Sequence, residues 1–329
     1  MKLGSSRTGT WCLFGFFLTL VTCLNAANAQ VVARVELHTL QALTLTDQQV
    51  LTGSKDAKPA TLAGELRLPP GAGRLPAVIL VHGSGGVSGY VDEWAQHFNS
   101  IGVATFVLDS FTGRGIVVTV NDQDQLGRLS MTVDTYRALE FLSRHSRIEP
   151  TKIMAMGFSR GGQAVLYSTM KRLIRQHGPS NGAEFAGYIT MYANCGTTYI
   201  DDVEVVDKPI RMFHGRADDY VPVAPCEAYV QRLQSKGKDV QLTVYPDAHH
   251  TFDSLLAKTP TKLAQAQTSR KCVLEEAPDG QTVNSVTKKP FTNAGDSCVE
   301  KGVTLAYNAE AHAQSLKAVD AFVNATFKR

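Results

Sequence analysis

The chain has 329 residues, a formal net charge of +3 and six cysteines, and 43% of its residues are hydrophobic. A small charge without basic runs argues against nucleic acid or an anionic surface as the main partner. About 300 residues downstream of the N-terminal segment can bury a large core, as one α/β domain or two smaller ones.

The first 29 residues have the pattern of a secretory signal peptide. Lys2 and Arg7 precede an apolar run, and small residues end the segment at Ala29. The run is too short to span a bilayer comfortably, and no later segment approaches the roughly 20 apolar residues a membrane helix needs. A lipid anchor on Cys23 is disfavoured because bulky residues precede it. We predict an exported chain, periplasmic or extracellular, whose residues 30–329 carry 31 basic and 30 acidic side chains.

Apolar and amphipathic segments alternate along the rest of the chain. Residues 33–40 and 61–69 predict a leading antiparallel pair of strands. Further on we expect strands over 76–82, 103–109, 152–158, 186–193, 209–215 and 239–246, and helices over 90–102, 132–146, 161–176 and 309–327. Uniformly apolar strands separated by helices indicate an α/β fold: a mostly parallel central sheet with helices on both faces.

Residues 254–305 do not fit this alternation. They are rich in Lys, Thr, Gly and Pro and contain two cysteines. We interpret them as an insertion between the last strand and the last helix of a single domain over 30–329. Two roles are open for this insertion, a lid over a functional site or a structural ornament.

Four cysteines remain once the signal peptide is removed: Cys195, Cys226, Cys272 and Cys298. An even number in an exported chain predicts two disulfides, with three connectivities open. The alternative, four buried thiols, is disfavoured by the oxidising compartment.

Ser159 follows the strand predicted over 152–158 and lies between Gly157 and Gly161. The Gly-x-Ser-x-Gly pentapeptide is a weak signal by itself. A helical pattern follows at once, and strand, sharp turn and helix are the context that a nucleophile elbow requires. Ser159 is therefore our candidate nucleophile, and the alternative is an ordinary serine in a glycine-rich turn.

A serine nucleophile needs an adjacent base, and the base needs an orienting acid. In this topology the chain order is Ser, then Asp or Glu, then His. The segment "HGRADDYVP" offers Asp218 and Asp219 after one strand, and "YPDAHHTFD" offers His249 and His250 after the next. One member of each pair is expected to face the site. A metal at the histidines is disfavoured because no third and fourth ligand accompany them, and we expect no cofactor.

Two backbone N–H groups are candidates for the oxyanion hole. One belongs to Arg160, directly after the nucleophile and at a helix N-terminus. The other belongs to Ser84, in the glycine-rich loop "VHGSGGVSG". Gly83 is the second candidate for this role. The loop lacks the Lys and Ser/Thr of a phosphate-binding P-loop, so nucleotide binding is disfavoured.

From about residue 60 to its C-terminus the chain resembles the dienelactone hydrolase branch of the α/β-hydrolase superfamily. The motifs that carry the resemblance are "VILVHGSGG", "LDSFTGRG", "GFSRGGQ", "HGRADDYVPVAPC" and "YPDAHHTFD". It implies an α/β-hydrolase fold, Asp218 as the acid and His250 as the base. It also implies a Cys195–Cys226 disulfide, which leaves Cys272 to pair with Cys298.

Two features depart from the enzymes that name the family. Those enzymes use a cysteine nucleophile and carry a glutamate directly after the loop histidine, where this chain has Ser159 and Gly83. The resemblance therefore implies hydrolase chemistry, and the substrate bond stays open among ester, lactone and thioester.

We expect substrate contacts from Phe111, Arg114 and Tyr220. Phe111 and Arg114 belong to the segment "DSFTGRG" after a central strand, and Arg114 is a candidate bidentate partner for a substrate carboxylate. The alternative for Arg114 is to brace a loop by bonding carbonyl groups. Trp94 is a further candidate for the pocket, with the core as its alternative.

These features together predict an exported serine hydrolase that cleaves carboxylic esters through an acyl-enzyme. Its partner is a small ester-type substrate, with neither nucleic acid nor a membrane involved. A prolyl-oligopeptidase-like peptidase is one rival, although such enzymes usually carry a large additional domain. A hydrolase-like binding protein without turnover is the other, and the presence of all three candidate residues disfavours it. Substrate identity and oligomeric state stay open.

Overall fold

The computed structural model describes Met1 and residues 32–328. The chain divides into two units, residues 1–30 and residues 31–329. Apart from Met1, the predicted signal peptide lies outside the described residues. Within the part of the chain that the structure describes, no helix has the length and apolarity needed to cross a membrane.

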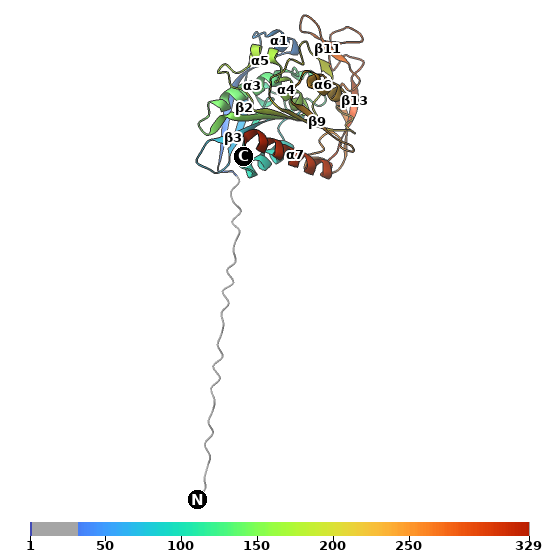
Figure 1. The fold of residues 1–329 in the computed structure, drawn as a ribbon. Coiled ribbons are helices and arrows are strands. Elements are labelled where there is room, and N and C mark those ends of the chain that lie inside the picture. The colour runs from blue at the N-terminus through green and yellow to red at the C-terminus, as the bar shows by residue number, and fades with distance from the viewer. Residues whose placement is uncertain (2–31, 329) are drawn as a thin grey trace. The chain divides into compact units, whose positions relative to one another are not determined.

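An eight-stranded sheet forms the centre of the second unit (Figure 1). In spatial order its strands are β1 (Arg34–Thr44), β2 (Lys58–Leu68), β4 (Ala104–Asp109), β3 (Leu75–Val81), β5 (Ile148–Phe158), β6 (Gly187–Met191), β8 (Ile210–Gly215) and β9 (Val240–Tyr245). The strands from β4 to β9 in this order run parallel to one another, whereas β1 and β2 are antiparallel to their neighbours. The predicted leading pair is therefore β1 and β2.

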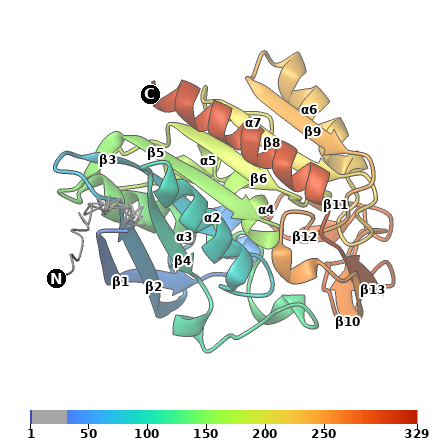
Figure 2. The ribbon, with the colours of Figure 1, turned by 90° about the horizontal axis from the view of Figure 1, so that it is seen from below.

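Helices cover both faces of the sheet (Figure 2). One face packs against α2 (Gly89–Ser100) and α7 (Ala309–Phe327), and the other against α3 (Ser130–Ser143), α4 (Arg160–Tyr167), α5 (Lys171–His177) and α6 (Ala224–Ser235). Strand β3 alternates between the two cores: Val78 and Leu80 join the first, whereas Ala77, Ile79 and Val81 join the second. A strand buried on both faces is apolar throughout, and the predicted fold class is confirmed.

The single helix expected over 161–176 is two helices, α4 and α5. The hydroxyl groups of Ser168 and Thr169 donate to carbonyl groups three residues back, which ends the first helix. Met170 is extended and bridges Val205 before α5 begins. Local side-chain bonding therefore breaks a pattern that is helical in sequence. Helix α6 and the short helix α1 (Asp47–Thr52) were not predicted.

The residues predicted as an insertion form two small sheets beside the carboxyl ends of the central strands (Figure 2). In one, β10 (Thr261–Thr268) pairs with β13 (Glu300–Leu305); in the other, β11 (Leu274–Glu276) pairs with β12 (Thr282–Asn284) and β7 (Thr197–Thr198). One disulfide, Cys272–Cys298, closes this segment, and the other, Cys195–Cys226, ties the loop after β6 to α6. Both pairings are those that the family resemblance implied.

The Cys272–Cys298 disulfide closes a loop with a sequence separation of 26 residues. Replacing both cysteines by serine should lower the free energy of unfolding by about 2–4 kcal/mol, because the cross-link restricts the unfolded chain. Urea unfolding of the double variant and the wild type measures the difference. Dithiothreitol should destabilise the wild type and leave a variant lacking all four cysteines unchanged; equal stability of all these proteins would contradict the prediction.

Candidate active site

Ser159 lies at a sharp turn between β5 and α4, with its backbone at φ +54° and ψ −115°. Two glycines make this turn sterically possible. A Cβ atom on Gly157 would lie 2.1 Å from the Gly161 carbonyl oxygen, and one on Gly161 would lie 2.1 Å from the Val81 carbonyl oxygen. The backbone segments therefore approach closely enough to exclude any side chain, as a nucleophile elbow requires.

A hydrogen-bonded chain of three side chains starts at Ser159. His250 Nε2 lies 2.9 Å from Ser159 Oγ, and His250 Nδ1 lies 2.7 Å from Asp218 Oδ2. The other carboxylate oxygen of Asp218 accepts the backbone N–H groups of Tyr220 and Val221 at 2.9 and 2.8 Å. The side chains that the sequence suggested as nucleophile, base and acid are thus in direct contact.

Asp219 and His249, which are adjacent in sequence to Asp218 and His250, make other contacts. The Asp219 carboxylate accepts the Thr304 backbone N–H at 2.7 Å and the Thr304 hydroxyl at 3.0 Å, which fastens the insertion to the central domain. His249 does not line the cavity beside Ser159, whereas His250 does. Asp218 and His250, the members that the motif alignment selected, are the two that contact each other.

The Asp218 carboxylate is buried and strongly stabilised as an anion. Burial by itself would raise the pKa of this carboxyl. The adjacent His250 ring, the buried His214 ring 3.9 Å away and the N–H group of Val221 outweigh burial and lower the pKa below its ordinary value. Asp218 is therefore ionised wherever the protein is folded near neutral pH, and it holds a proton on His250 Nδ1.

The loop after β3 is fixed by His82, which sequence reasoning did not single out. His82 Nε2 accepts the Ser110 N–H at 3.2 Å, so the neutral ring carries its proton on Nδ1 and donates it to the Gly83 carbonyl at 2.8 Å. Burial lowers the pKa of His82 and keeps it neutral. In a trans peptide the Gly83 carbonyl and the Ser84 N–H point in opposite directions. This bond therefore fixes the direction of the Ser84 N–H in a loop that contacts Ser159.

The Arg160 side chain serves as a brace, while its backbone begins α4. Its guanidinium donates to the carbonyl groups of Leu126 and Gln123 at 2.9 and 2.7 Å, and to Gln123 Oε1 at 2.8 Å. Burial and the nearby Arg128 lower the pKa of Arg160 to about 10, which leaves it protonated at neutral pH. The brace fixes the loop that carries Gln123 against the start of α4.

An apolar cavity of about 310 Å3 opens beside Ser159 and His250. Its walls come from the loop after β3, the segment around Val120, and the insertion. The insertion contributes Leu256, Ala257, Thr261, Leu263 and Leu305, the last residue of β13. Tyr192 and Tyr220 also line this cavity, and their rings lie 4.5 and 4.8 Å from the His250 ring. The insertion therefore forms part of the wall of this cavity.

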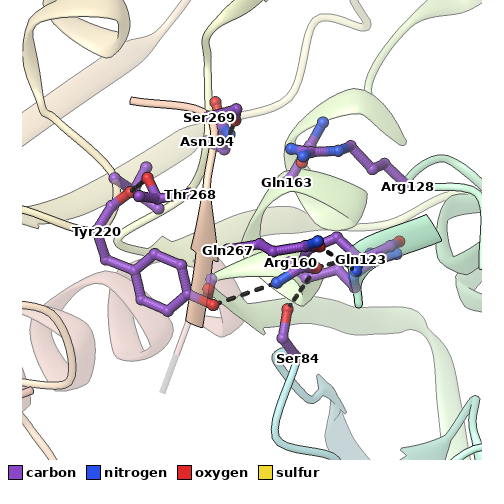
Figure 3. A pocket seen from close by; sticks show the side chains of 12 residues that line it. Ser84, Gln123, Arg128, Arg160, Gln163, Asn194, Tyr220, Gln267, Thr268 and Ser269 are labelled. Atoms are coloured by element: carbon purple, nitrogen blue, oxygen red, sulfur yellow. Dashed lines mark hydrogen bonds between the residues drawn. The ribbon is translucent and has the colours of Figure 1, made fainter. Parts of the chain in front are cut away.

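A second, smaller notch of about 30 Å3 also borders Ser159, and Figure 3 shows polar side chains that line it. Its lining is Ser84, Gln123, Arg128, Ser159, Arg160, Gln163, Asn194, Tyr220, Val221, Gln267, Thr268 and Ser269. Gln123 connects this lining, because its side chain bonds Ser84, Arg160 and Tyr220. His250 does not border the notch. No sequence motif marks Gln123 or Arg128, which reach the site through tertiary contacts alone.

The structure overturns two of the expected substrate contacts. Arg114 is buried and forms two bonds to the Asp134 carboxylate at 2.7 and 2.8 Å, with further bonds to the carbonyl groups of Ser110 and Leu43. Phe111 packs edge-on against His82, with ring centroids 4.4 Å apart, and lines neither cavity beside Ser159. Both side chains therefore stabilise the loop after β4, and neither lines a cavity beside Ser159.

Of the remaining two candidates for substrate contact, Tyr220 lines the cavities beside Ser159 and Trp94 does not. Tyr220 lines both cavities, as expected. Trp94 belongs to the core, where its indole N–H donates to Asp253 Oδ2 at 2.7 Å. Burial raises the pKa of the Asp253 carboxyl, so this acid differs electrostatically from Asp218.

One group of three potential metal ligands occurs among the described residues, formed by Glu36, His38 and His145. Glu36 Oε2 lies 2.9 Å from His38 Nε2 and 3.1 Å from His145 Nε2, and Arg34 bonds the other carboxylate oxygen. The Arg147 N–H donates to His145 Nδ1 at 3.3 Å. The group lines neither cavity beside Ser159, and its contacts are those of a hydrogen-bonded charge cluster.

The doubly covered parallel sheet and the serine elbow after β5 define an α/β-hydrolase. A model of the dienelactone hydrolase family matches residues 62–275. The chain belongs to the dienelactone hydrolase family, and it is an enzyme that hydrolyses ester-type bonds.

Three similar proteins illustrate the relationship. A probable 2-oxo-3-(5-oxofuran-2-ylidene)propanoate lactonase of Bradyrhizobium is 24% identical over 203 residues, covering 57% of this chain and 80% of that protein. A putative carboxymethylenebutenolidase of Methylorubrum extorquens is 21% identical over 198 residues, covering 56% and 66%. The crystal structure of a dienelactone hydrolase-like promiscuous phosphotriesterase from metagenomic libraries superposes with a TM-score of 0.55 at 17% identity, covering 89% and 98%. This last likeness concerns the fold.

Replacing Arg114 by Met should destabilise the protein without changing substrate binding. Removing one partner of a buried ion pair leaves the Asp134 charge uncompensated and costs about 3–5 kcal/mol. Urea unfolding measures the loss, and steady-state kinetics at low temperature should give a KM within about twofold of the wild type. A raised KM in a variant of unchanged stability would contradict this prediction and indicate that Arg114 binds the substrate.

The lowered pKa of Asp218 predicts how stability depends on pH. A carboxyl whose pKa is lower in the folded state stabilises the protein above its unfolded pKa of about 3.9, and this contribution is lost as the pH falls through the folded pKa. The wild type should therefore be more stable than Asp218→Asn at pH 6, and the difference should shrink between pH 4 and pH 2.5. Urea titrations of both proteins at these values test the sign; a difference that grows in acid would contradict it.

Proposed function

We propose that this enzyme is a serine esterase that cleaves carboxylic esters through an acyl-enzyme on Ser159. The observation that carries the proposal is the hydrogen-bonded chain from Ser159 through His250 to Asp218, which borders an apolar cavity. A serine hydroxyl becomes a useful nucleophile when a positioned base accepts its proton. Here the base lies within hydrogen-bond reach and its second nitrogen is held by a buried carboxylate.

In the first half-reaction Ser159 Oγ attacks the ester carbonyl carbon while its proton passes to His250 Nε2. The resulting imidazolium is stabilised by the Asp218 carboxylate, which keeps its own charge. Negative charge gathers on the carbonyl oxygen, where the backbone N–H groups of Ser84 and Arg160 donate to it. The His82 bond to the Gly83 carbonyl supports the Ser84 assignment, because it fixes that peptide plane before substrate arrives.

The tetrahedral intermediate then collapses and the alcohol leaves with the proton from His250, which forms the acyl-enzyme on Ser159 and completes the first half-reaction. The second half-reaction hydrolyses this acyl-enzyme. A water molecule then gives a proton to His250 Nε2 and attacks the acyl carbon, and the acid departs as Ser159 recovers its proton. Every step uses side chains and backbone groups of this chain, and the protons balance over the cycle.

Two observations favour an open-chain ester over the lactones named for the two curated relatives. Ser159 replaces the cysteine of the enzymes that name the family. Gly83 stands where those enzymes carry a glutamate, and a Cβ atom there would lie 3.2 Å from Ser159 Cβ and 3.1 Å from the Phe158 carbonyl oxygen. A side chain at position 83 would thus crowd the nucleophile.

We also propose that the enzyme is exported to the periplasm or beyond, as one domain over residues 30–329 with the insertion at 254–305. Two disulfides support an oxidising compartment. The charged, apolar and small-residue order of the first 29 residues supports a cleaved signal peptide.

Replacing Ser159 by Ala should reduce kcat on p-nitrophenyl acetate by a factor of about 10^4 or more, because no nucleophile remains. The fold should persist, with an unchanged circular dichroism spectrum. Mass spectrometry after fluorophosphonate treatment should find one adduct on Ser159 in the wild type and none in the variant. Ser235→Ala, at the exposed end of α6, is the matched control. Wild-type rates in Ser159→Ala would refute the proposed nucleophile.

A further inference from the structure

We propose that the two cavities beside Ser159 divide the ester between them: the apolar cavity binds the alcohol half, and the polar notch binds a short acyl half. The inferred substrates are acetate or propionate esters of larger apolar alcohols. This inference rests on the proposed serine esterase function and adds the substrate class to it.

The position of His250 assigns the alcohol half. The leaving oxygen receives its proton from His250 Nε2, so this oxygen must come within hydrogen-bond distance of that atom. His250 borders the apolar cavity and does not border the notch. The carbon chain attached to the leaving oxygen therefore continues into the apolar cavity.

The size and lining of the apolar cavity suit an alkyl or aryl alcohol. At about 10–15 Å3 for each water-sized group, the cavity of about 310 Å3 has room for about twenty or more such groups, which is ample for a hexyl or aryl chain. Val120, Leu256, Leu263 and Leu305 lie along its walls. Removing an alkyl chain from water against these side chains is favourable in proportion to the apolar area buried.

The notch is placed to receive the other substituent of the carbonyl carbon. It borders Ser159 together with Ser84 and Arg160, the two residues whose N–H groups are proposed to hold the oxyanion. At about 10–15 Å3 for each water-sized group, the notch of about 30 Å3 has room for about two or three such groups. An acetyl or propionyl group meets that limit, and a hexanoyl group exceeds it.

The polarity of the notch also excludes long acyl chains. The side chains of Arg128, Gln163 and Asn194 belong to the lining of the notch and are polar. Figure 3 shows the Arg128 guanidinium beside Gln163, with Asn194 and Ser269 across the pocket. Methylene groups packed here would displace water from polar side chains without replacing its hydrogen bonds, which is costly.

Two isomeric esters test the division with the same atoms in each substrate. Hexyl acetate presents a short acyl and a long alcohol half, and ethyl hexanoate presents the reverse. Acid release followed by pH-stat should give a kcat/KM for hexyl acetate at least tenfold that for ethyl hexanoate. Equal rates or the opposite preference, in an enzyme that forms the Ser159 adduct, would overturn the division alone. Absence of both the adduct and any cleavage would overturn the proposed function, and the division with it.

Two variants locate the preference in the cavities. The Gln163 amide makes no hydrogen bond to another described residue, so Gln163→Ala enlarges the notch without breaking one and should lower the tenfold ratio by at least threefold. Leu256 is 67% exposed at the rim of the apolar cavity, so Leu256→Trp should fold normally and slow hexyl acetate more than ethyl acetate. A ratio unmoved by either variant, with both folded, would overturn the assignment of the two cavities.

Discussion

The close approach of three backbone segments around Ser159 is the constraint on which the site depends. The end of β5, the start of α4 and the end of β3 meet at Gly157, Gly161 and Val81, with no room for a further Cβ atom. Ser159 is thereby held at φ +54°, a conformation that costs about 1–3 kcal/mol and persists only where the surroundings enforce it. Since β5 and β3 are neighbouring central strands buried on both faces, the core of the domain supplies that enforcement.

One pair of adjacent aspartates links the reaction centre to the insertion. Asp218 holds the His250 ring as a buried anion, whereas Asp219 bonds both the backbone and the hydroxyl of Thr304. The Arg270 guanidinium adds a bond to the Asp219 carbonyl. The turn that orients the acid is therefore the same turn that anchors β13, and the insertion is fixed relative to the site that it helps to enclose.

Two surfaces of opposite character meet at the same serine hydroxyl. The insertion contributes apolar side chains such as Leu256 and Leu263, while Gln123 and two arginines make the notch polar. Such contrast gives an esterase a way to distinguish the two ends of its substrate, because burying alkyl groups is favourable on one side and leaves donors unpaired on the other.

The sequence by itself determined the α/β class and most of the sheet, because strands buried on both faces are apolar throughout and helices between them are amphipathic. The sequence also predicted the Gly-x-Ser-x-Gly turn and the chain order of Ser159, Asp218 and His250, since each of these residues follows a strand end at a characteristic motif. Only the tertiary structure decided the rest. Arg114 was expected to contact the substrate, but in the structure it forms an ion pair with buried Asp134. No local sequence pattern reveals this partner. The break between α4 and α5, the Gln123 network and the two unlike cavities likewise arise from contacts between residues far apart in the chain, which periodicity and motif spacing do not encode.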